Sequence, residues 1–144
     1  MQLISPIRPI RIPDEILSVT DILIVNETEL GFLACEKTSI KDISAAAQKI
    51  KTHADQILII TLGSKGALVV ENDAYLVEGL KVKAIDTVGA GDCFTGVIAA
   101  QLAQNKSLRE AVEIANKAAS ICVTRKGAAP SMPHAREIQR NIPD

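Results

Sequence analysis

The sequence has 144 residues, 47% of them hydrophobic and 23% charged, and a formal net charge of -1. This length and composition suit a chain with one hydrophobic core and exclude a disordered or fibrous protein. The 16 basic and 17 acidic residues nearly cancel, and only 2% of the residues are aromatic, which argues against a nucleic-acid partner. The aromatic residues Phe32, Tyr75 and Phe94 are expected in the core.

A predicted strand, turn and helix follow a proline-rich start. Residues 1–13 contain three prolines and show no hydrophobic period. Residues 14–20 then indicate a short helical turn, and residues 21–25 indicate a buried strand. The acidic residues directly after this strand suit the start of a helix, because the helix dipole favours negative charge there.

The next segment predicts a helix and a neighbouring strand. Apolar residues recur from Ile40 to Ile50 at helical spacing, with Ser39 as the expected cap, so an amphipathic helix should end near His53. Residues 56–62 are apolar on both faces, which is typical of a central strand covered on both sides. Strand, helix and strand together predict a βαβ crossover.

Further strands and a glycine-rich turn are predicted after this crossover. Residues 63–66 turn the chain into a second apolar strand, residues 67–70. A hairpin turn at residues 72–73 leads to residues 75–77, so these strands should pair antiparallel. Residues 81–85 alternate between charged and apolar side chains, which predicts another strand before the glycine-rich turn.

The last third of the chain is predicted to be helical. Residues 93–104 are apolar and alanine-rich, residues 107–124 carry apolar side chains at helical spacing, and residues 135–141 form a last short helix. Alternating strands and helices place the chain in the α/β class. No stretch reaches the roughly 20 apolar residues that a membrane-spanning helix requires.

The cysteines and histidines indicate neither a disulfide framework nor a zinc site. Cys35, Cys93 and Cys122 are odd in number and far apart, and they form no metal-binding spacing with His53 or His134. All three cysteines are expected to be inert packing residues. Because the start lacks the pattern of a signal peptide, we expect a cytoplasmic protein.

Three polar or glycine-rich turns follow predicted strands, at residues 26–29, 61–66 and 86–92. Open α/β sheets bind ligands at the carboxyl ends of their strands, so we expect these turns to converge.

The turn of residues 86–92 is the densest candidate site. Its glycines allow the amides of Gly89, Ala90 and Gly91 to point at one anion at a helix start, which suits a phosphate group in transfer. Asp92 beside them could accept the proton of an attacking hydroxyl. The alternative is that Asp92 only caps the helix and the glycines only turn the chain.

Two common phosphate-binding motifs are incomplete. Gly63 is followed by Ser64 and Lys65, and position 58 is a leucine, so the order of a P-loop is missing. Phe94 stands where a dinucleotide-binding fingerprint requires a third glycine, which weakens a dehydrogenase interpretation.

Four motifs in this order resemble the ribokinase family of carbohydrate kinases. They are NETE at residues 26–29, TLGSKG at 61–66, DTVGAGD at 86–92 and VTRKGAAPS at 123–131. The resemblance covers nearly the whole chain. It implies the carboxyl-terminal half of a Rossmann-like, three-layer α/β/α fold, with residues 1–144 as a single partial domain.

The resemblance also implies roles for the matched residues. Asp92 would be the base that deprotonates the sugar hydroxyl, and Gly89, Ala90 and Gly91 would form the anion hole for the γ-phosphoryl group. Asn26 would contact a phosphate and Glu29 would organise metal-bound water, with plain helix capping as the alternative for both. The other implied ATP-site positions are Thr61, Leu62, Gly63, Ser64, Lys65, Gly66, Gly91, Asp92 and Asn116. Taken alone, Asn116 would be a surface residue.

A monovalent-cation site is implied beside the anion hole, largely through backbone carbonyls. Its positions are Asp86, Val88, Cys122, Arg125, Gly127 and Ser131. The implied cofactors are therefore ATP, Mg²⁺ and K⁺. The implied reaction is ATP-dependent phosphorylation of a sugar hydroxyl, with ribose to ribose 5-phosphate as the leading candidate and no covalent enzyme intermediate.

The amino-terminal half, which in the family supplies the first strands and the segment that grips the sugar, is expected to be absent from this chain. A noncatalytic nucleotide-binding or interaction module is therefore a second hypothesis. A dinucleotide-binding domain is a third, and it requires NAD(H) to bind better than ATP. An uncovered sheet edge would favour self-association or pairing with a complementary amino-terminal half.

Overall fold

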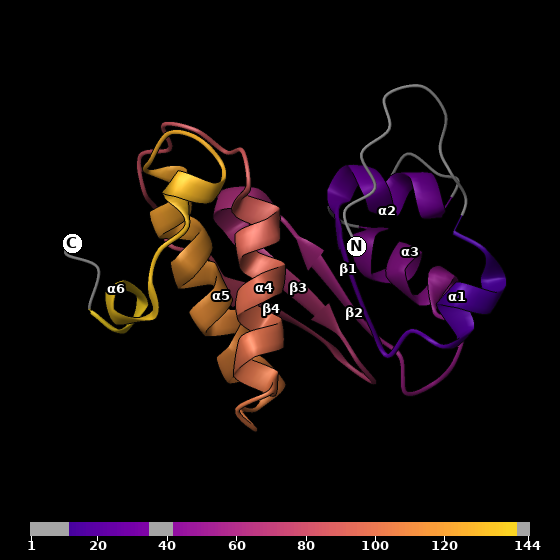
Figure 1. The fold of residues 1–144 in the computed structure, drawn as a ribbon. Coiled ribbons are helices and arrows are strands. Elements are labelled where there is room, and N and C mark those ends of the chain that lie inside the picture. The colour runs from indigo at the N-terminus through magenta and orange to yellow at the C-terminus, as the bar shows by residue number, and fades with distance from the viewer. Residues whose placement is uncertain (1–11, 35–41, 141–144) are drawn as a thin grey trace. The chain divides into compact units, whose positions relative to one another are not determined.

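The computed structural model describes residues 12–34 and 42–140. They divide into two compact units. The first unit contains the described residues up to Leu62 together with residues 67–76, and the second contains residues 63–66 and 77–140. Figure 1 labels the helices and strands of both units.

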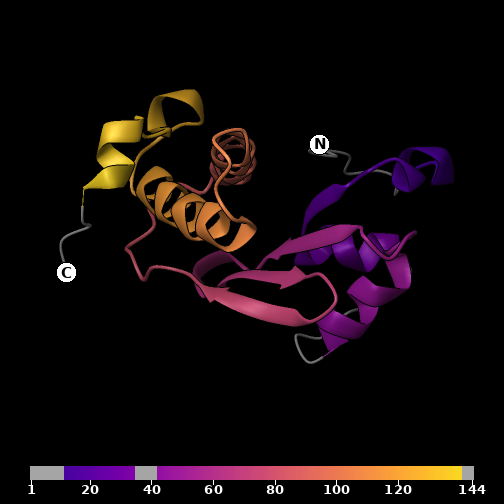
Figure 2. The ribbon, with the colours of Figure 1, turned by 90° about the horizontal axis from the view of Figure 1, so that it is seen from below.

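The first unit contains most of a four-stranded sheet with the order β1-β2-β3-β4, which is visible in Figure 2. Its elements are α1 (Asp14–Ser18), β1 (Ile22–Asn26), α2 (Glu27–Leu33), α3 (Ile43–Ile50), β2 (Ile57–Thr61), β3 (Gly66–Val70) and β4 (Ala74–Glu78). The first residue of β3, Gly66, and the last two residues of β4, residues 77–78, belong to the second unit.

The βαβ crossover is confirmed, because β1 and β2 pair parallel from Ile22–Ile57 to Asn26–Thr61. The helices α2 and α3 lie between these strands in the chain and contact each other. Their apolar faces and the strands form one buried cluster, which includes Leu30 and Ala47, both with no exposed area. Burial of apolar side chains thus holds the crossover together.

The antiparallel part of the sheet is also confirmed. Strand β3 pairs antiparallel with β2, from Leu58–Val70 to Thr61–Ala67. Strands β3 and β4 are hydrogen-bonded neighbours joined by the short turn of residues 71–73, which is too short to connect a parallel pair, so the predicted hairpin is present. Leu58, Ile59 and Ile60 are fully buried, so both faces of β2 are covered, as its sequence predicts.

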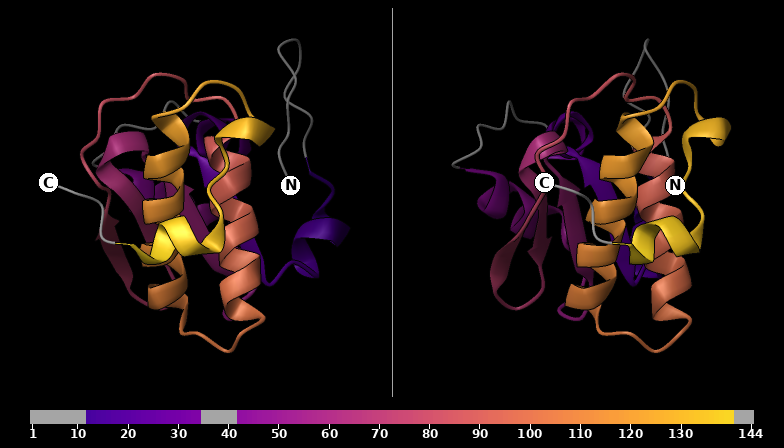
Figure 3. Two further views of the ribbon diagram at one scale, coloured as in Figure 1. Left: turned by 60° about the vertical axis from the view of Figure 1, so that its left-hand side comes forward. Right: turned by 90° about the vertical axis from the view of Figure 1, so that its left-hand side faces the viewer.

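The second unit contains a pair of long helices, α4 (Ala90–Leu102) and α5 (Leu108–Val123), which lie side by side in both views of Figure 3. Ser107 begins α5 with a capping box, in which its Oγ accepts from the Glu110 N–H. The shorter elements are η2 (Gly63–Lys65), η3 (Ala129–Ser131) and α6 (Ala135–Gln139).

Three sequence predictions about local structure are wrong. Residues 81–85 form no strand. The Ile85 N–H donates to the carbonyl of Val123, the last residue of α5, at 2.7 Å and not to a neighbouring strand. The third candidate turn therefore does not follow a strand. Helix α3 ends at Ile50 rather than near His53, because Lys51 already has extended backbone angles. The expected cap Ser39 lies outside the described residues.

The third wrong prediction is the core position of Phe32, whose side chain is 58% exposed. Leu30 and Leu33 supply the inward face of α2, and Phe32, two residues from Leu30, points elsewhere. Phe94 is buried as predicted. In residues 12–34 and 42–140, no helix has both the length and the apolar character to cross a membrane.

Candidate active site

The carboxyl ends of β1 and β2 bring two of the predicted turns together. Asn26 and Thr61 end the two strands and are partners in the parallel register. The Thr61 hydroxyl donates to the Val25 carbonyl at 3.5 Å, which ties the second strand end to the first. Residues 26–29 and the start of residues 61–66 therefore converge at this edge of the first unit. Leu62, next to Thr61, is buried in the first unit's core.

Asn26 and Glu29 form a reciprocal capping box at the start of α2. The Glu29 N–H donates to Asn26 Oδ1 and the Asn26 N–H donates to Glu29 Oε2, both at 2.9 Å. The capping alternative is therefore present in the structure. Because Oδ1 faces the helix, the NH₂ group is the part of the Asn26 amide that the box does not use. An NH₂ group is a donor and suits an anion.

The turn after β2 packs against the end of β4 within the second unit. Gly66 has φ +102°, and a Cβ at this position would lie 2.1 Å from the Val77 carbonyl oxygen. The Gly79 N–H donates to the Lys65 carbonyl at 3.1 Å. The path of the turn therefore requires glycine at position 66, while Gly63, Ser64 and Lys65 are exposed.

Asn116 is buried, which corrects the interpretation that it is a surface residue when taken alone. Only 7% of it is exposed, and its Nδ2 donates to the carbonyls of Val77 at 3.0 Å and Glu78 at 3.2 Å. The amide thus satisfies backbone acceptors at the end of β4. Gly66 and Asn116, two of the predicted ATP-site positions, contact the same segment, residues 77–79.

The start of α4 carries the predicted anion hole and base. Gly89 is the N-cap with φ +81°, and its carbonyl accepts the Cys93 N–H at 2.9 Å. The Ala90 N–H donates to the Thr87 carbonyl at 3.3 Å. Gly91 and Asp92 are exposed in the first turn, where backbone N–H groups have no acceptor inside the helix. Gly89 occupies the N-cap position, and Asp92 lies in the first turn, where a carboxylate also stabilises the helix through its dipole.

The Asp86 side chain connects this loop to the turn after α5. Its Oδ1 accepts the Val88 N–H at 3.0 Å and its Oδ2 accepts the Gly127 N–H at 2.9 Å. The hydrogen bond from Gly127, followed by that from Val88, lowers the pKa of Asp86 below its ordinary value. Asp86 therefore stays ionised at neutral pH.

All six predicted cation-site positions lie in the second unit. The Asp86 carboxylate joins Val88 to Gly127, as described above. The Arg125 N–H donates to the Cys122 carbonyl at 3.1 Å, and the buried Ser131 hydroxyl lies 2.9 Å from Cys122 Sγ. The Asp86 carboxylate supplies the negative charge among these six positions, and both of its described contacts are with N–H donors.

The packing prediction is confirmed for Cys93 and Cys122, which are both buried and free. Burial, and next the contact with Cys122, raises the pKa of Cys93 to about 11. A thiol with this pKa is a poor nucleophile at neutral pH. Cys35 lies outside the described residues.

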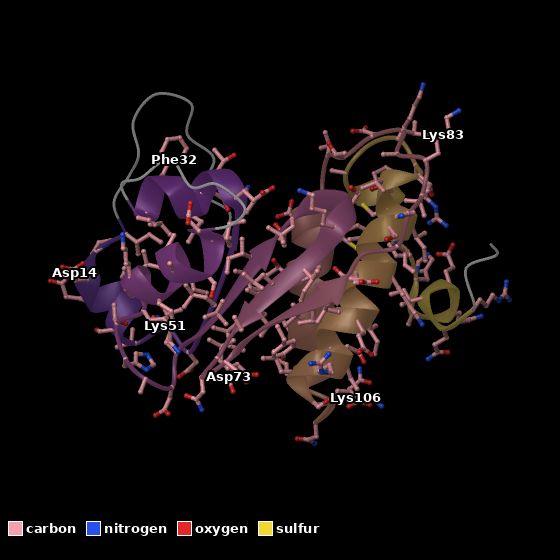
Figure 4. The ribbon with its side chains drawn as sticks, turned by 180° about the vertical axis from the view of Figure 1, so that it is seen from behind. Asp14, Phe32, Lys51, Asp73, Lys83 and Lys106 are labelled. Carbon is pink, nitrogen blue, oxygen red and sulfur yellow. The ribbon has the colours of Figure 1, made fainter. Side chains whose placement is uncertain are left out.

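A separate depression of about 420 Å³ lies in the first unit and contains none of the predicted site residues. It is lined by Gln48, Lys51, Thr52, His53, Ala54, Glu71 and Asn72. Lys51, labelled in Figure 4, donates to the carbonyls of Ala54 and Glu71, so its ammonium group ties two loops together. In the part of the chain that the structure describes, no three His, Cys, Asp or Glu residues gather as a metal-ligand set.

Residues 5–135 match the family model of the pfkB family carbohydrate kinases. The chain belongs to this family. Among curated proteins, it is 38% identical over 131 residues to a ribokinase from Arabidopsis thaliana, and the match covers 88% of this chain and 35% of the relative. The chain thus spans well under half the length of this relative.

Solved structures of similar proteins agree with the α/β fold. The structure of Arabidopsis thaliana ribokinase complexed with ribose and ATP has a TM-score of 0.84 and 34% identity, and the match covers 93% of this chain and 44% of that one. A double mutant of Vibrio cholerae fructokinase, with fructose, ADP and potassium ion bound, has a TM-score of 0.74 and 30% identity, with 87% and 41% covered. Both likenesses support a ribokinase-like fold for the chain.

Proposed function

We propose that this chain supplies the nucleotide-binding and phosphoryl-transfer part of an ATP-dependent sugar kinase, with ribose as the sugar. The observation that carries the proposal is the start of α4, where the exposed Asp92 lies one turn after the left-handed Gly89. The similarity to a ribokinase that binds ribose and ATP supports this choice of substrates.

In the proposed reaction, Asp92 accepts the proton of the sugar hydroxyl as that oxygen attacks the γ-phosphorus of ATP. A new oxygen–phosphorus bond forms, the bond to the β-phosphate bridging oxygen breaks, and its electron pair leaves with ADP. The amides of Gly89, Ala90 and Gly91 form the anion hole at the positive end of the helix dipole, and the Ala90 N–H would exchange its 3.3 Å bond to the Thr87 carbonyl for one to the phosphoryl group. These amides stabilise the charge on the transferred group.

Further positions are proposed to contact ATP. Asn26 contacts a phosphate through its NH₂ group and Glu29 orders water on a Mg²⁺ ion, which would neutralise phosphate charge when bound. The turn formed by Thr61, Leu62 and residues 63–66, together with Asn116, lines the nucleotide site. K⁺ would be held by Asp86 and by carbonyls at the other five cation-site positions.

The partial span of the chain leads to a proposal about partners. The sugar-binding contacts would come from a complementary amino-terminal half, and self-association of the chain is the alternative to this pairing. Strand β1 lies at one edge of the sheet, and an edge strand offers backbone groups for pairing with a further strand. A cytoplasmic location and a single partial domain over residues 1–144 belong to the same proposal.

Release of ADP from Mg·ATP by the purified chain, with K⁺ and with ribose or fructose, tests the proposed function. An Asp92→Asn variant and a reaction without sugar are the controls. Turnover that requires ribose and is lost in the variant supports a ribose kinase, whereas a preference for fructose changes the substrate. Binding of Mg·ATP without turnover would mean that turnover requires the amino-terminal half or that the chain is a noncatalytic nucleotide-binding module, and tighter binding of NAD(H) would contradict both.

A further inference from the structure

The turn of residues 123–128, called here the clasp turn, fastens the loop that precedes α4. The Val123 carbonyl accepts from the N–H groups of Ile85 at 2.7 Å and Asp86 at 3.2 Å. Gly127 donates to the Asp86 carboxylate at 2.9 Å. Ala128 lies against Gly89, where an added Cβ would be 3.0 Å from the Ala128 Cα. A shift of the clasp turn would therefore move the loop that carries the proposed cation site and anion hole.

Helix α6 holds the clasp turn from its other side. The Arg125 Nη2 group forms an ion pair with Glu137 Oε1, and the side chains are 38% and 35% exposed. The second oxygen of Glu137 accepts the His134 N–H at 2.8 Å, at the start of α6. One carboxylate thus joins the start of α6 to the middle of the clasp turn.

The residues between the two ends of this ion pair have their own internal bonds. The buried Ser131 hydroxyl donates to the Ala128 carbonyl at 2.6 Å and lies 2.9 Å from Cys122 Sγ. Gly127 takes a left-handed conformation with φ +85°. Local hydrogen bonds and the Gly127 conformation therefore shape this segment, and the ion pair links its two ends, Arg125 and Glu137.

We infer that the ion pair of Arg125 with Glu137 positions the clasp turn against Asp86 and Gly89. Glu137 is then a positioning residue, because it acts through the turn and contacts none of the proposed reacting groups. That the positioned loop binds K⁺ and the transferred phosphoryl group rests on the proposed function.

A matched pair of variants in the full chain tests this inference. Glu137→Gln removes the charge but keeps an oxygen for the His134 N–H. Glu110→Gln does the same at the start of α5, where Glu110 accepts the Ser107 N–H at 3.1 Å and pairs with Lys106 at 3.7 Å. Figure 4 shows Lys106 at the opposite end of the α4–α5 pair from Lys83. Glu110 lies in the first turn of α5 and the clasp turn begins at its last residue, Val123, so about 20 Å of helix at 1.5 Å per residue separates them.

The measurement is hydrogen exchange of the Gly127 amide by NMR, because this amide reports the bond to Asp86 directly. We expect exchange roughly two- to five-fold faster in Glu137→Gln, as for loss of a partly exposed ion pair, and unchanged in Glu110→Gln. Unchanged exchange in Glu137→Gln, or an equal increase in both single variants, would overturn the inference.

The K⁺ concentration that gives half-maximal enhancement of Mg·ATP binding supplies a functional reading. It should rise in Glu137→Gln by about the same factor as the exchange rate. If K⁺ has no effect on the parent chain while Gly127 exchange changes as expected, the proposed cation site fails and the positioning role stands.

Discussion

Asn26 has two separable roles in this account, and substitutions can divide them. Its Oδ1 caps α2 by accepting the Glu29 N–H at 2.9 Å, and its NH₂ group is proposed to contact a phosphate of ATP. Serine and aspartate are N-caps about as good as asparagine, but neither carries the NH₂ donor. Alanine removes the cap and the donor together.

The magnitudes follow from these two interactions. Asn26→Ala should lower the free energy of unfolding by about 1 kcal/mol through loss of the cap, while Asn26→Ser should leave it close to the parent value. Loss of a hydrogen bond to a charged phosphate should raise the Kd for Mg·ATP roughly 10- to 100-fold in both variants. Asn26→Asp should bind more weakly still, because its carboxylate repels the phosphates.

Urea unfolding measures the free energy of unfolding, and calorimetric titration of the same preparations measures the Kd for Mg·ATP. The expected pattern is normal stability with weak binding for Asn26→Ser. If Asn26→Ser binds Mg·ATP as tightly as the parent chain, Asn26 is a helix cap only and its assignment to the ATP site is wrong.

Three further predictions concern glycine packing, thiol reactivity and pH. Gly66→Ala should prevent stable folding, because the new Cβ would lie 2.1 Å from a backbone oxygen, whereas Gly96→Ala on α4, with nothing within 4 Å, should stabilise the chain by about 0.5–1 kcal/mol in thermal unfolding. Iodoacetamide at pH 8 should leave Cys93 unmodified in peptide mass spectra of the native chain, since a pKa of about 11 leaves only about 0.1% thiolate; rapid labelling at neutral pH would contradict its burial. Because the folded-state pKa of Asp86 is lowered, its contribution to stability is present at neutral pH and is lost as pH falls below its ordinary value of 3.8 through the folded value. Asp86→Asn should therefore have a flatter stability profile in acid, and a profile parallel to that of the parent chain would refute the bonds to Val88 and Gly127.

The elements that the sequence predicted best are those whose residues follow a local pattern of apolar and charged side chains. The apolar run of β2 and the acidic start of α2 lead directly to a parallel pair whose ends carry Thr61 and Asn26. Family motifs supplied the roles of the site residues, which composition and spacing alone left open between chemistry and helix capping.

Long-range backbone contacts explain what the sequence did not predict. Asn116 is buried because carbonyls of residues 77 and 78, far away in the chain, accept its amide. Residues 81–85 alternate as a strand would, but Ile85 bonds to the turn after α5 instead. The ion pair between Arg125 and Glu137 gave no signal in the sequence, since its partners are separated by a loop whose shape depends on Gly127 and Ser131.

The most direct test of the proposed function is a titration of the ¹⁵N-labelled chain with Mg·ATP in the presence of K⁺, followed through its backbone amide signals. The amide signals of Gly63, Gly66, Gly89 and Gly91 should shift on binding, while that of Gly96 should not. Shifts confined to the depression around Lys51, or no shift with Mg·ATP at millimolar concentration, would contradict the claim that these loops form the nucleotide and phosphoryl-transfer site.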